Sequence, residues 1–215
     1  MRRSVRLRVG LALSVLGGSV LGAGVQGSPA QPARMVRVPV GIEAPTCVLT
    51  GQDGRRLALR DLMGKAVLVA FVYTSCPDVC PLMFGAATAV QRRVQAEGRG
   101  DVVSVFVTTD PEVDTPEVLR AFATRRGADL PSTVLLTGSA DELRAVWEAF
   151  GVKVRRLARG LVDHSPLTFL IDARGVIRYR YLGGILDTET IAADVRTVLA
   201  NTTTKRGAHG AHGAR

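Results

Sequence analysis

The stretch KAVLVAFVYTSCPDVCP, residues 65–81, runs from a series of apolar residues directly into two cysteines. Its apolar part is nearly unbroken and rich in strand-forming residues, a pattern typical of a strand buried on both faces of a sheet. Residues 79–97 favour a helix that ends at Gly98. Cys76 and Cys80 are therefore predicted to lie where the carboxyl end of a strand meets a helix, a place where reactive residues collect in α/β sheets. The pair is a candidate disulfide, reactive thiol pair or half of a metal site.

Further segments on both sides complete the fold prediction. Residues 47–62 predict a short hairpin around the turn QDGR, and Thr115 followed by Pro116 predicts the capped start of a helix. The remaining segments predict strands at 102–109 and 132–138 and a pair of strands around a tight turn at 167–182. They also predict helices at 139–151 and 188–200. Strands that alternate with helices, followed by a terminal hairpin and helix, indicate an α/β protein. We predict a thioredoxin-like fold, with a central mixed sheet flanked by helices.

The N-terminal segment predicts export. Residues 1–27 begin with several arginines and continue into an apolar stretch, as in a cleaved signal peptide or an uncleaved membrane anchor, and both alternatives stay open. Positive charge ahead of the apolar stretch places the rest of the chain at the outer face of the cytoplasmic membrane or in the periplasm. We then predict a linker at 28–40, a thioredoxin-like domain at 41–200 and a low-complexity His/Gly tail at 201–215.

The composition argues against nucleic-acid binding. The 215-residue chain has a formal net charge of +9, but four of its arginines precede the apolar N-terminal stretch. The other basic residues are interspersed with acidic ones, and only 5% of residues are aromatic, so the sequence has no basic stripe with stacking side chains. With 47% hydrophobic residues, the chain can bury one ordinary core. We expect one folded domain and no nucleic-acid partner.

The chain has three cysteines, which limits how they can pair. An exported protein meets an oxidising compartment, but an odd number leaves at least one thiol unpaired within the chain. A disulfide between Cys76 and Cys80 would close so small a loop that it would add little stability. Cys47 is interpreted as a buried, inert thiol, with redox exchange or dimerisation as the alternative.

Metal binding by the cysteine pair requires a further ligand. Cys76 and Cys80 are four positions apart, so their sulfurs face the same side if the first helical turn includes both. The N-terminus of a helix stabilises thiolates, which suits a soft metal as well as a redox pair. Imidazole is a suitable third donor for copper. His209 and His212 lie in the tail, whereas His164, in the segment VDHSP, precedes a buried strand and is the candidate ligand.

Four longer segments carry a family resemblance. They are DGRRLALRDLMGKAVLVAFVYTSCPDVCP, VFVTTDPEVDTPEVLRAFA, LTGSADELRAVWEAFGV and VDHSPLTFLID. In this order they resemble the Sco/SenC family of thioredoxin-like copper proteins, which assist assembly of cytochrome c oxidase. The resemblance implies that Cys76, Cys80 and His164 bind copper, as Cu(I) or Cu(II). It also implies a client, the oxidase subunit that carries the dinuclear copper site. A thiol reductant or another copper chaperone would be a further partner, as would the membrane if the N-terminal segment stays uncleaved.

A second function is compatible with the same cysteines. Cys76 and Cys80 would be the redox-active pair of a thiol-disulfide oxidoreductase that reduces the cysteines of the copper-receiving protein. Pro166 supports this alternative, because thioredoxins place a cis-proline beside their active cysteines and Sco proteins usually have another residue there. The three residues between the cysteines oppose it, since ordinary oxidoreductases have two. A thiol peroxidase has less support, because the sequence shows no arginine paired with a dominant cysteine.

Four aspartates close to these motifs are given structural roles. Asp163 is expected to hydrogen-bond to His164 or orient it. Asp78 is expected either to tune the charge of the cysteines or to cap the helix. Asp110 and Asp114 are expected to be loop and cap residues rather than metal ligands.

Overall fold

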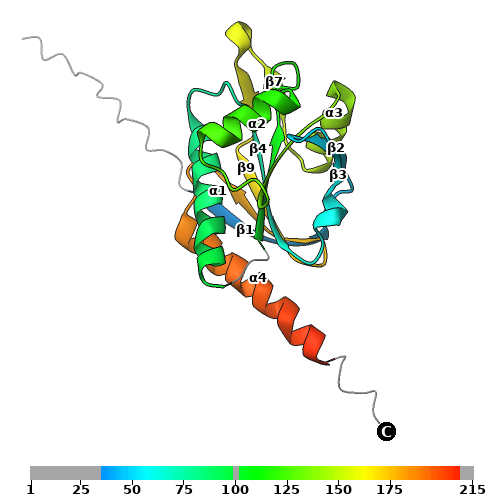
Figure 1. Cartoon of the computed structure of the whole chain (residues 1–215), viewed down its shortest axis with the longest axis vertical. Coiled ribbons are helices and arrows are strands. Elements are labelled where there is room, and N and C mark those ends of the chain that lie inside the picture. The colour runs from blue at the N-terminus through cyan, green and yellow to red at the C-terminus, as the bar shows by residue number, and fades with distance from the viewer. Residues whose placement is uncertain (1–34, 99–101, 209–215) are drawn as a thin grey trace, which may run out of the picture. The chain divides into compact units, whose positions relative to one another are not determined.

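The computed structural model describes residues 35–98 and 102–208 (Figure 1). The expected signal peptide or anchor at 1–27 and most of the expected linker lie outside these ranges, as do His209 and His212. Within the described ranges, no helix is long and apolar enough to cross a membrane. The structure therefore bears on the folded domain, and export stays a prediction.

The described part of the chain forms one eight-stranded sheet and a separate two-stranded ribbon. Across the sheet the strands follow the order β1 (Val36–Glu43), β10 (Val176–Leu182), β9 (Leu167–Ile171), β4 (Ala66–Val72), β5 (Val102–Thr108), β6 (Thr133–Thr137), β2 (Val48–Gly51) and β3 (Arg56–Ala58). The central strands β4, β5 and β6 run parallel to one another, and the other neighbouring pairs are antiparallel. The predicted mixed sheet is confirmed.

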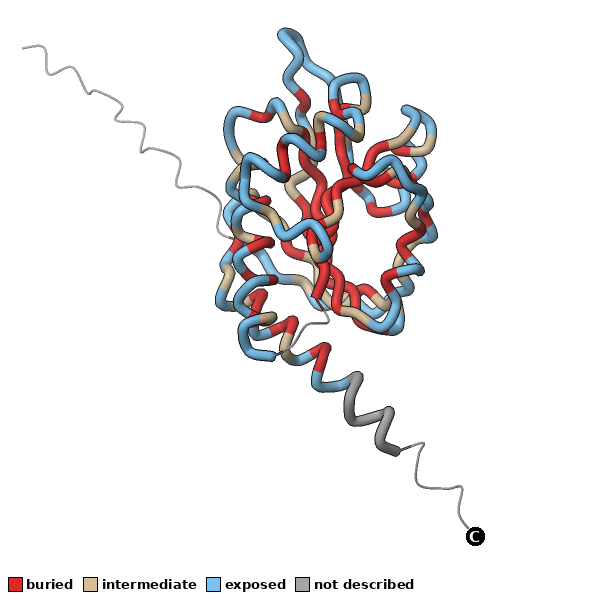
Figure 2. Tube along the Cα trace, in the orientation of Figure 1, coloured by how far each residue is buried: buried red, intermediate tan, exposed pale blue. Residues whose placement is uncertain are grey.

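Helices cover both faces of this sheet (Figure 1). They are α1 (Val79–Ala96), α2 (Pro116–Arg125), α3 (Ala140–Ala149), α4 (Thr188–Ala208) and the short 3-10 helices η1 (Leu59–Leu62) and η2 (Ala158–Gly160). The helices α1, α2 and α4 pack on the side of β4 that carries Leu68 and Ala70. On the opposite side, α3 and η1 pack against Val69 and Phe71. Every residue of β4 is buried because alternate side chains enter different cores, which appear as the red centre of Figure 2.

The helix boundaries follow the predicted capping residues. The hydroxyl oxygen of Thr115 accepts a hydrogen bond from the Val118 amide at 3.3 Å, and Pro116 is the first residue of α2. Gly98 and Gly127 follow α1 and α2 with φ angles of 77° and 63°. Glycine adopts this left-handed conformation without steric penalty, so both helices end where the sequence indicates.

An edge strand begins where a linker was predicted. β1 begins at Val36, inside the segment expected to be a linker, and pairs with β10. Its sequence, VRVPVGIE, alternates apolar residues with others, but most of its side chains are exposed, and Pro39 and Gly41 are disfavoured inside strands. Arg37 attaches it to α4 through two hydrogen bonds to the Asp194 carboxylate, at 2.6 and 2.7 Å. Pairing with β10 and the contact of Arg37 with Asp194 hold this strand at the edge of the sheet.

The separate ribbon lies in the segment between α3 and β9, where the sequence has no regular pattern. It consists of β7 (Val154–Arg156) and β8 (Val162–His164), joined through η2. His164 is the last residue of β8, directly ahead of Ser165, Pro166 and the buried strand β9.

Candidate metal centre

The two cysteines lie on either side of the start of α1. Because β4 ends at Val72 and α1 begins at Val79, Cys76 belongs to the connecting loop and Cys80 to the first helical turn. The Cys80 amide donates a hydrogen bond to Cys76 Sγ at 3.4 Å. Both residues are buried, and both thiols are free. The turn that opens the helix thus brings the two cysteines together.

His164 meets this pair from the β7–β8 ribbon. Its Nε2 atom lies 3.6 Å from Cys80 Sγ, although the two residues are 84 positions apart in sequence. Its Nδ1 atom lies 3.3 Å from the Ser165 carbonyl oxygen. A carbonyl can only accept, so Nδ1 carries the proton and Nε2 presents its lone pair to the thiol. The ring of Tyr73 packs edge-on against the imidazole, with ring centroids 6.0 Å apart.

The site holds the Cys80 thiol and the His164 imidazole in their neutral forms. Burial and the hydrogen bond with the Cys76 side chain raise the pKa of the Cys80 thiol far above its ordinary value. Burial lowers the pKa of His164, against the opposing effect of the Ser165 carbonyl. For Cys80, the cost of burying a charge outweighs the stabilisation of about 1 kcal/mol that a helix N-terminus gives to a thiolate. A thiol and a neutral imidazole face each other at neutral pH.

The three candidate ligands are only partly arranged as a metal site. Among residues 35–98 and 102–208, no three His, Cys, Asp or Glu side chains are already arranged to hold a metal ion. What the fold brings together is the Cys80–His164 contact, with Cys76 hydrogen-bonded to Cys80. Two sulfur donors and one imidazole are a chemically suitable set for copper. A three-ligand site therefore requires a local adjustment of side chains that are already neighbours.

One expectation about a neighbouring residue is wrong, and two open alternatives are narrowed. Asp163 does not orient His164: its exposed carboxylate accepts a hydrogen bond from Arg155 at 2.8 Å, on the other side of the ribbon strand. Pro166 follows a trans peptide bond, since the described residues contain no cis peptide. Asp78 occupies the N-cap position of α1 but makes no capping hydrogen bond with its side chain, so of its two expected roles only tuning the charge of the cysteines stays a prediction. The Ser165 carbonyl supplies the imidazole contact that was expected from Asp163.

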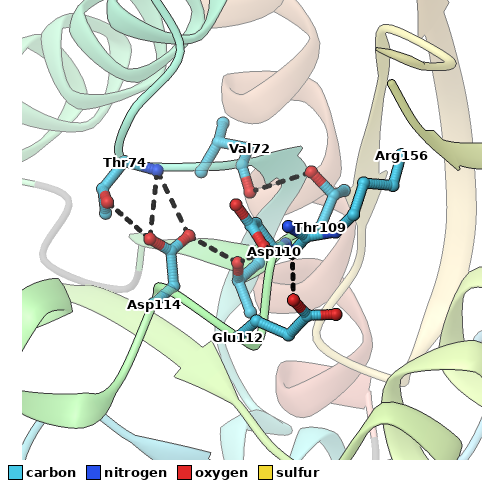
Figure 3. Close-up of polar contacts among 8 residues, drawn as sticks. Val72, Thr74, Thr109, Asp110, Glu112, Asp114 and Arg156 are labelled. Carbon is cyan, nitrogen blue, oxygen red and sulfur yellow. Dashed lines mark hydrogen bonds and ion pairs between the residues drawn. The ribbon is translucent and has the colours of Figure 1, made fainter. Parts of the chain in front are cut away.

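The acidic loop between β5 and α2 is more closely tied to the site than its sequence suggested. Asp110 and Asp114 are loop residues as expected, but both are fully buried. Asp114 binds Thr74 in the cysteine loop, while Asp110 binds Arg156 of β7 (Figure 3). The available sequence signal was two acids in the loop that follows a buried strand. Their partners are 40 and 46 positions away, and no sequence spacing identifies them.

The remaining residues of interest lie elsewhere. Cys47 is buried in the core under α3, on the other face of the sheet from Cys76 and Cys80. The described part of the chain also contains a pocket lined by Leu59, Arg60 and Asp172, among others, and none of the three candidate ligands lines it.

The model of the SCO1/SenC family matches residues 43–200 of the chain. The chain belongs to this family. The matched range contains Cys76, Cys80 and His164, and the resemblance noted in the sequence is confirmed. The Sco/SenC assignment also accounts for the mixed sheet with helices on both faces.

Individual relatives agree with this assignment. The SCO2-like protein of Rickettsia typhi is 31% identical over 141 residues, which cover 62% of this chain and 68% of that protein. The match to the corresponding Rickettsia prowazekii protein covers 63% of it, so the chain spans about two thirds of these relatives.

Two solved structures share the fold. The structure of Arabidopsis thaliana ScoI with copper bound is 27% identical, with a TM-score of 0.67, and the match covers 74% of this chain and 98% of that one. BsSco is a member of the Sco family of cytochrome c oxidase assembly proteins in which a disulfide switch was identified. It is 26% identical, with a TM-score of 0.66, and the match covers 77% of this chain and 98% of that one. The predicted thioredoxin-like fold is confirmed.

Proposed function

We propose that this Sco/SenC protein is a copper chaperone. It binds Cu(I) or Cu(II) through Cys76, Cys80 and His164, and it delivers copper to the subunit that carries the dinuclear copper site of cytochrome c oxidase. The contact of 3.6 Å between Cys80 Sγ and His164 Nε2 is the observation that carries this proposal. Copper bound to ScoI and the oxidase-assembly role of BsSco's family support it.

The donor set suits copper as a cargo that arrives and leaves. Thiolates are soft ligands that select Cu(I), and imidazole adds a donor suited to Cu(II). Cys80 is fully buried, whereas His164 is half-buried, so an incoming protein can reach the site from the side of the histidine. Binding requires loss of the thiol protons, so copper loading releases protons to solvent.

Thiol–disulfide chemistry is the second candidate function. The disulfide switch of BsSco favours reversible oxidation of Cys76 and Cys80, which would remove both thiolates and block copper loading until a reductant restores them. A dedicated oxidoreductase fits less well. The trans bond before Pro166 removes its best support, and the raised pKa of Cys80 makes that thiol a weak nucleophile at neutral pH.

The proposed place of action is outside the cytoplasm. The arginine-rich, apolar segment at 1–27 supports export to the outer face of the cytoplasmic membrane or the periplasm. This location suits a protein that meets oxidants as well as copper, and it makes loading depend on an exported thiol reductant or a copper-donating partner.

The test is copper binding by the purified protein, reduced and then freed of reductant, beside His164→Ala. The intact protein should bind copper stoichiometrically and show a visible thiolate-to-Cu(II) absorption. Loss of the imidazole should remove this band and lower Cu(II) affinity more than about 100-fold, because changes beyond the direct ligands alone cost about 10- to 100-fold. The matched control is Asp163→Asn, which alters the neighbouring exposed carboxylate and should leave both measurements unchanged.

One result of this experiment would contradict the proposed copper chaperone. Absence of stoichiometric copper, together with rapid cycling of Cys76 and Cys80 between dithiol and disulfide, would contradict the chaperone and support the oxidoreductase.

A further inference from the structure

His164 lies on an element that depends on its contacts with the rest of the domain. The β7–β8 ribbon has two strands of three residues each and is separate from the main sheet. Within it, Val154 pairs with His164 and Arg156 pairs with Val162. A two-stranded ribbon is marginally stable by itself. Its attachments to the domain must therefore fix where His164 lies relative to Cys80.

One of these attachments is an ion pair with a buried acid. The Arg156 guanidinium donates to Asp110 Oδ1 and lies 3.2 Å from the Glu112 carboxylate (Figure 3). Asp110 is fully buried, and its Oδ2 atom has no hydrogen-bond partner among the described residues. Burial raises the pKa of Asp110, and the charge of Arg156 opposes that rise. A buried carboxylate with one unpaired oxygen depends strongly on its cation, so this pair resists separation. Val162 adds the apolar half of the attachment by packing into the core.

The same loop holds the cysteine side of the site. Asp114 accepts hydrogen bonds from the Thr74 amide at 3.1 and 3.3 Å, from the Thr74 hydroxyl, and from the Thr108 hydroxyl at 2.5 Å. Thr74 is two residues before Cys76. The Asp114 amide in turn donates to the Asp110 carbonyl at 2.9 Å, so the two acids belong to one tight turn. We call residues 110–114 the aspartate loop.

We propose that the aspartate loop positions both halves of the candidate metal centre, and that Arg156 is the positioning residue that holds His164 against Cys80. Asp114 fixes the loop that leads to Cys76, and Asp110 fixes the ribbon that ends at His164. The two halves come from segments far apart in sequence, and one short loop joins them.

This inference rests on the proposed function, because it takes copper as the metal. It deepens that function by predicting different effects on the binding of Cu(I) and of Cu(II). Two thiolates satisfy Cu(I), whereas Cu(II) depends on the nitrogen donor. If Arg156 holds His164 in place, loss of Arg156 weakens Cu(II) binding and leaves Cu(I) binding nearly intact. A residue that served only general stability would change both affinities together.

The experiment compares Arg156→Gln with Arg155→Gln in the full-length protein. Arg155 is the neighbouring residue on the same strand, and its partner Asp163 is exposed. Arg156→Gln should lower Cu(II) affinity about 10- to 100-fold, as for other residues that hold a metal ligand in place. Cu(I) affinity, measured by chelator competition, should change less than about threefold, and Arg155→Gln should change neither. Equal losses for Cu(I) and Cu(II), or no loss for Cu(II), would overturn the proposal.

Two further variants keep the test decisive. Arg156→Lys retains a cation beside Asp110 and should restore most of the Cu(II) affinity. Asp110→Asn removes the buried charge instead of leaving it unpaired, so it tests the same attachment even if Arg156→Gln does not fold. It should show the same selective loss of Cu(II).

A measurement without copper separates this inference from the proposed function. In the copper-free protein, NMR should detect proton contacts between the rings of Tyr73 and His164, whose centroids are 6.0 Å apart. Arg156→Gln should lose these contacts, and Arg155→Gln should keep them. Should the intact protein bind no copper, the chaperone proposal fails, but the ring contacts still decide whether Arg156 positions His164.

Discussion

Each face of the sheet buries cysteine thiols, in different surroundings. Cys47 under α3 and Cys76 beside α1 have the same exposure, 9%, and burial raises the pKa of both Cys47 and Cys80. The difference lies in their polar neighbours. Cys80 contacts the imidazole of His164 and the side chain of Cys76, whereas Cys47 hydrogen-bonds to the backbone of Leu59. Burial sets the protonation state on both faces, and neighbouring donors decide which face can bind a metal.

The largest effect that separates the two faces is on Cu(I) affinity. Cys80→Ser replaces a soft sulfur donor with a hard oxygen, and we expect Cu(I) affinity to fall more than about 100-fold. Cys47→Ser makes the same chemical change on the other face and should leave the affinity unchanged. Competition with a Cu(I) chelator measures both. A comparable loss in Cys47→Ser would show that the third thiol takes part in binding, and the comparison would be wrong.

The local structure around Cys80 was readable from sequence, because it depends on near neighbours. The apolar run of β4, the helix after it and the stop at Gly98 follow from residues a few positions apart. The contact between Cys80 and His164 spans 84 positions. Ligand chemistry and the family resemblance suggested it, since no periodicity of the chain links a loop cysteine to a distant ribbon.

The surroundings of the site were less predictable, for a physical reason. Asp163 is adjacent to His164 in sequence, but along a strand adjacent side chains point to opposite faces, so it pairs with Arg155 instead. Arg156 resembles many other arginines of the chain until the fold places it on the buried Asp110. The strand β1 was missed although its apolar residues alternate, because Pro39 and Gly41 are disfavoured inside strands and its place at the sheet edge depends on pairing with β10.

An effect of intermediate size is expected in the pH dependence of Cu(I) affinity. Below its raised pKa the Cys80 thiol keeps its proton, so copper must displace that proton to bind the sulfur. The lowered pKa of His164 means that the imidazole is already neutral at neutral pH and releases no proton there. Apparent Cu(I) affinity should therefore rise about tenfold per pH unit for the proton displaced from Cys80, between about pH 6.5 and about pH 8.5.

Affinity measured across this range, with proton release in weakly buffered solution, checks the prediction. Cys47→Ser is the matched control and should keep the same slope, because its thiol is not displaced by copper. A slope near zero in the intact protein would mean that Cys80 is already a thiolate.

The smallest expected effect concerns the stability contributed by Cys47. Cys47→Ala removes one buried sulfur from the core that also contains Leu49 and Phe71. The loss should resemble deletion of one buried methyl or methylene group and lower the free energy of unfolding by about 1 kcal/mol. In urea denaturation the midpoint should fall while the slope stays constant, because the surface exposed on unfolding is nearly the same. Copper affinity should not change. Burial in the folded domain argues for an inert thiol. A disulfide-linked dimer that the intact protein forms on a non-reducing gel, and that Cys47→Ala loses, would instead give Cys47 an intermolecular role.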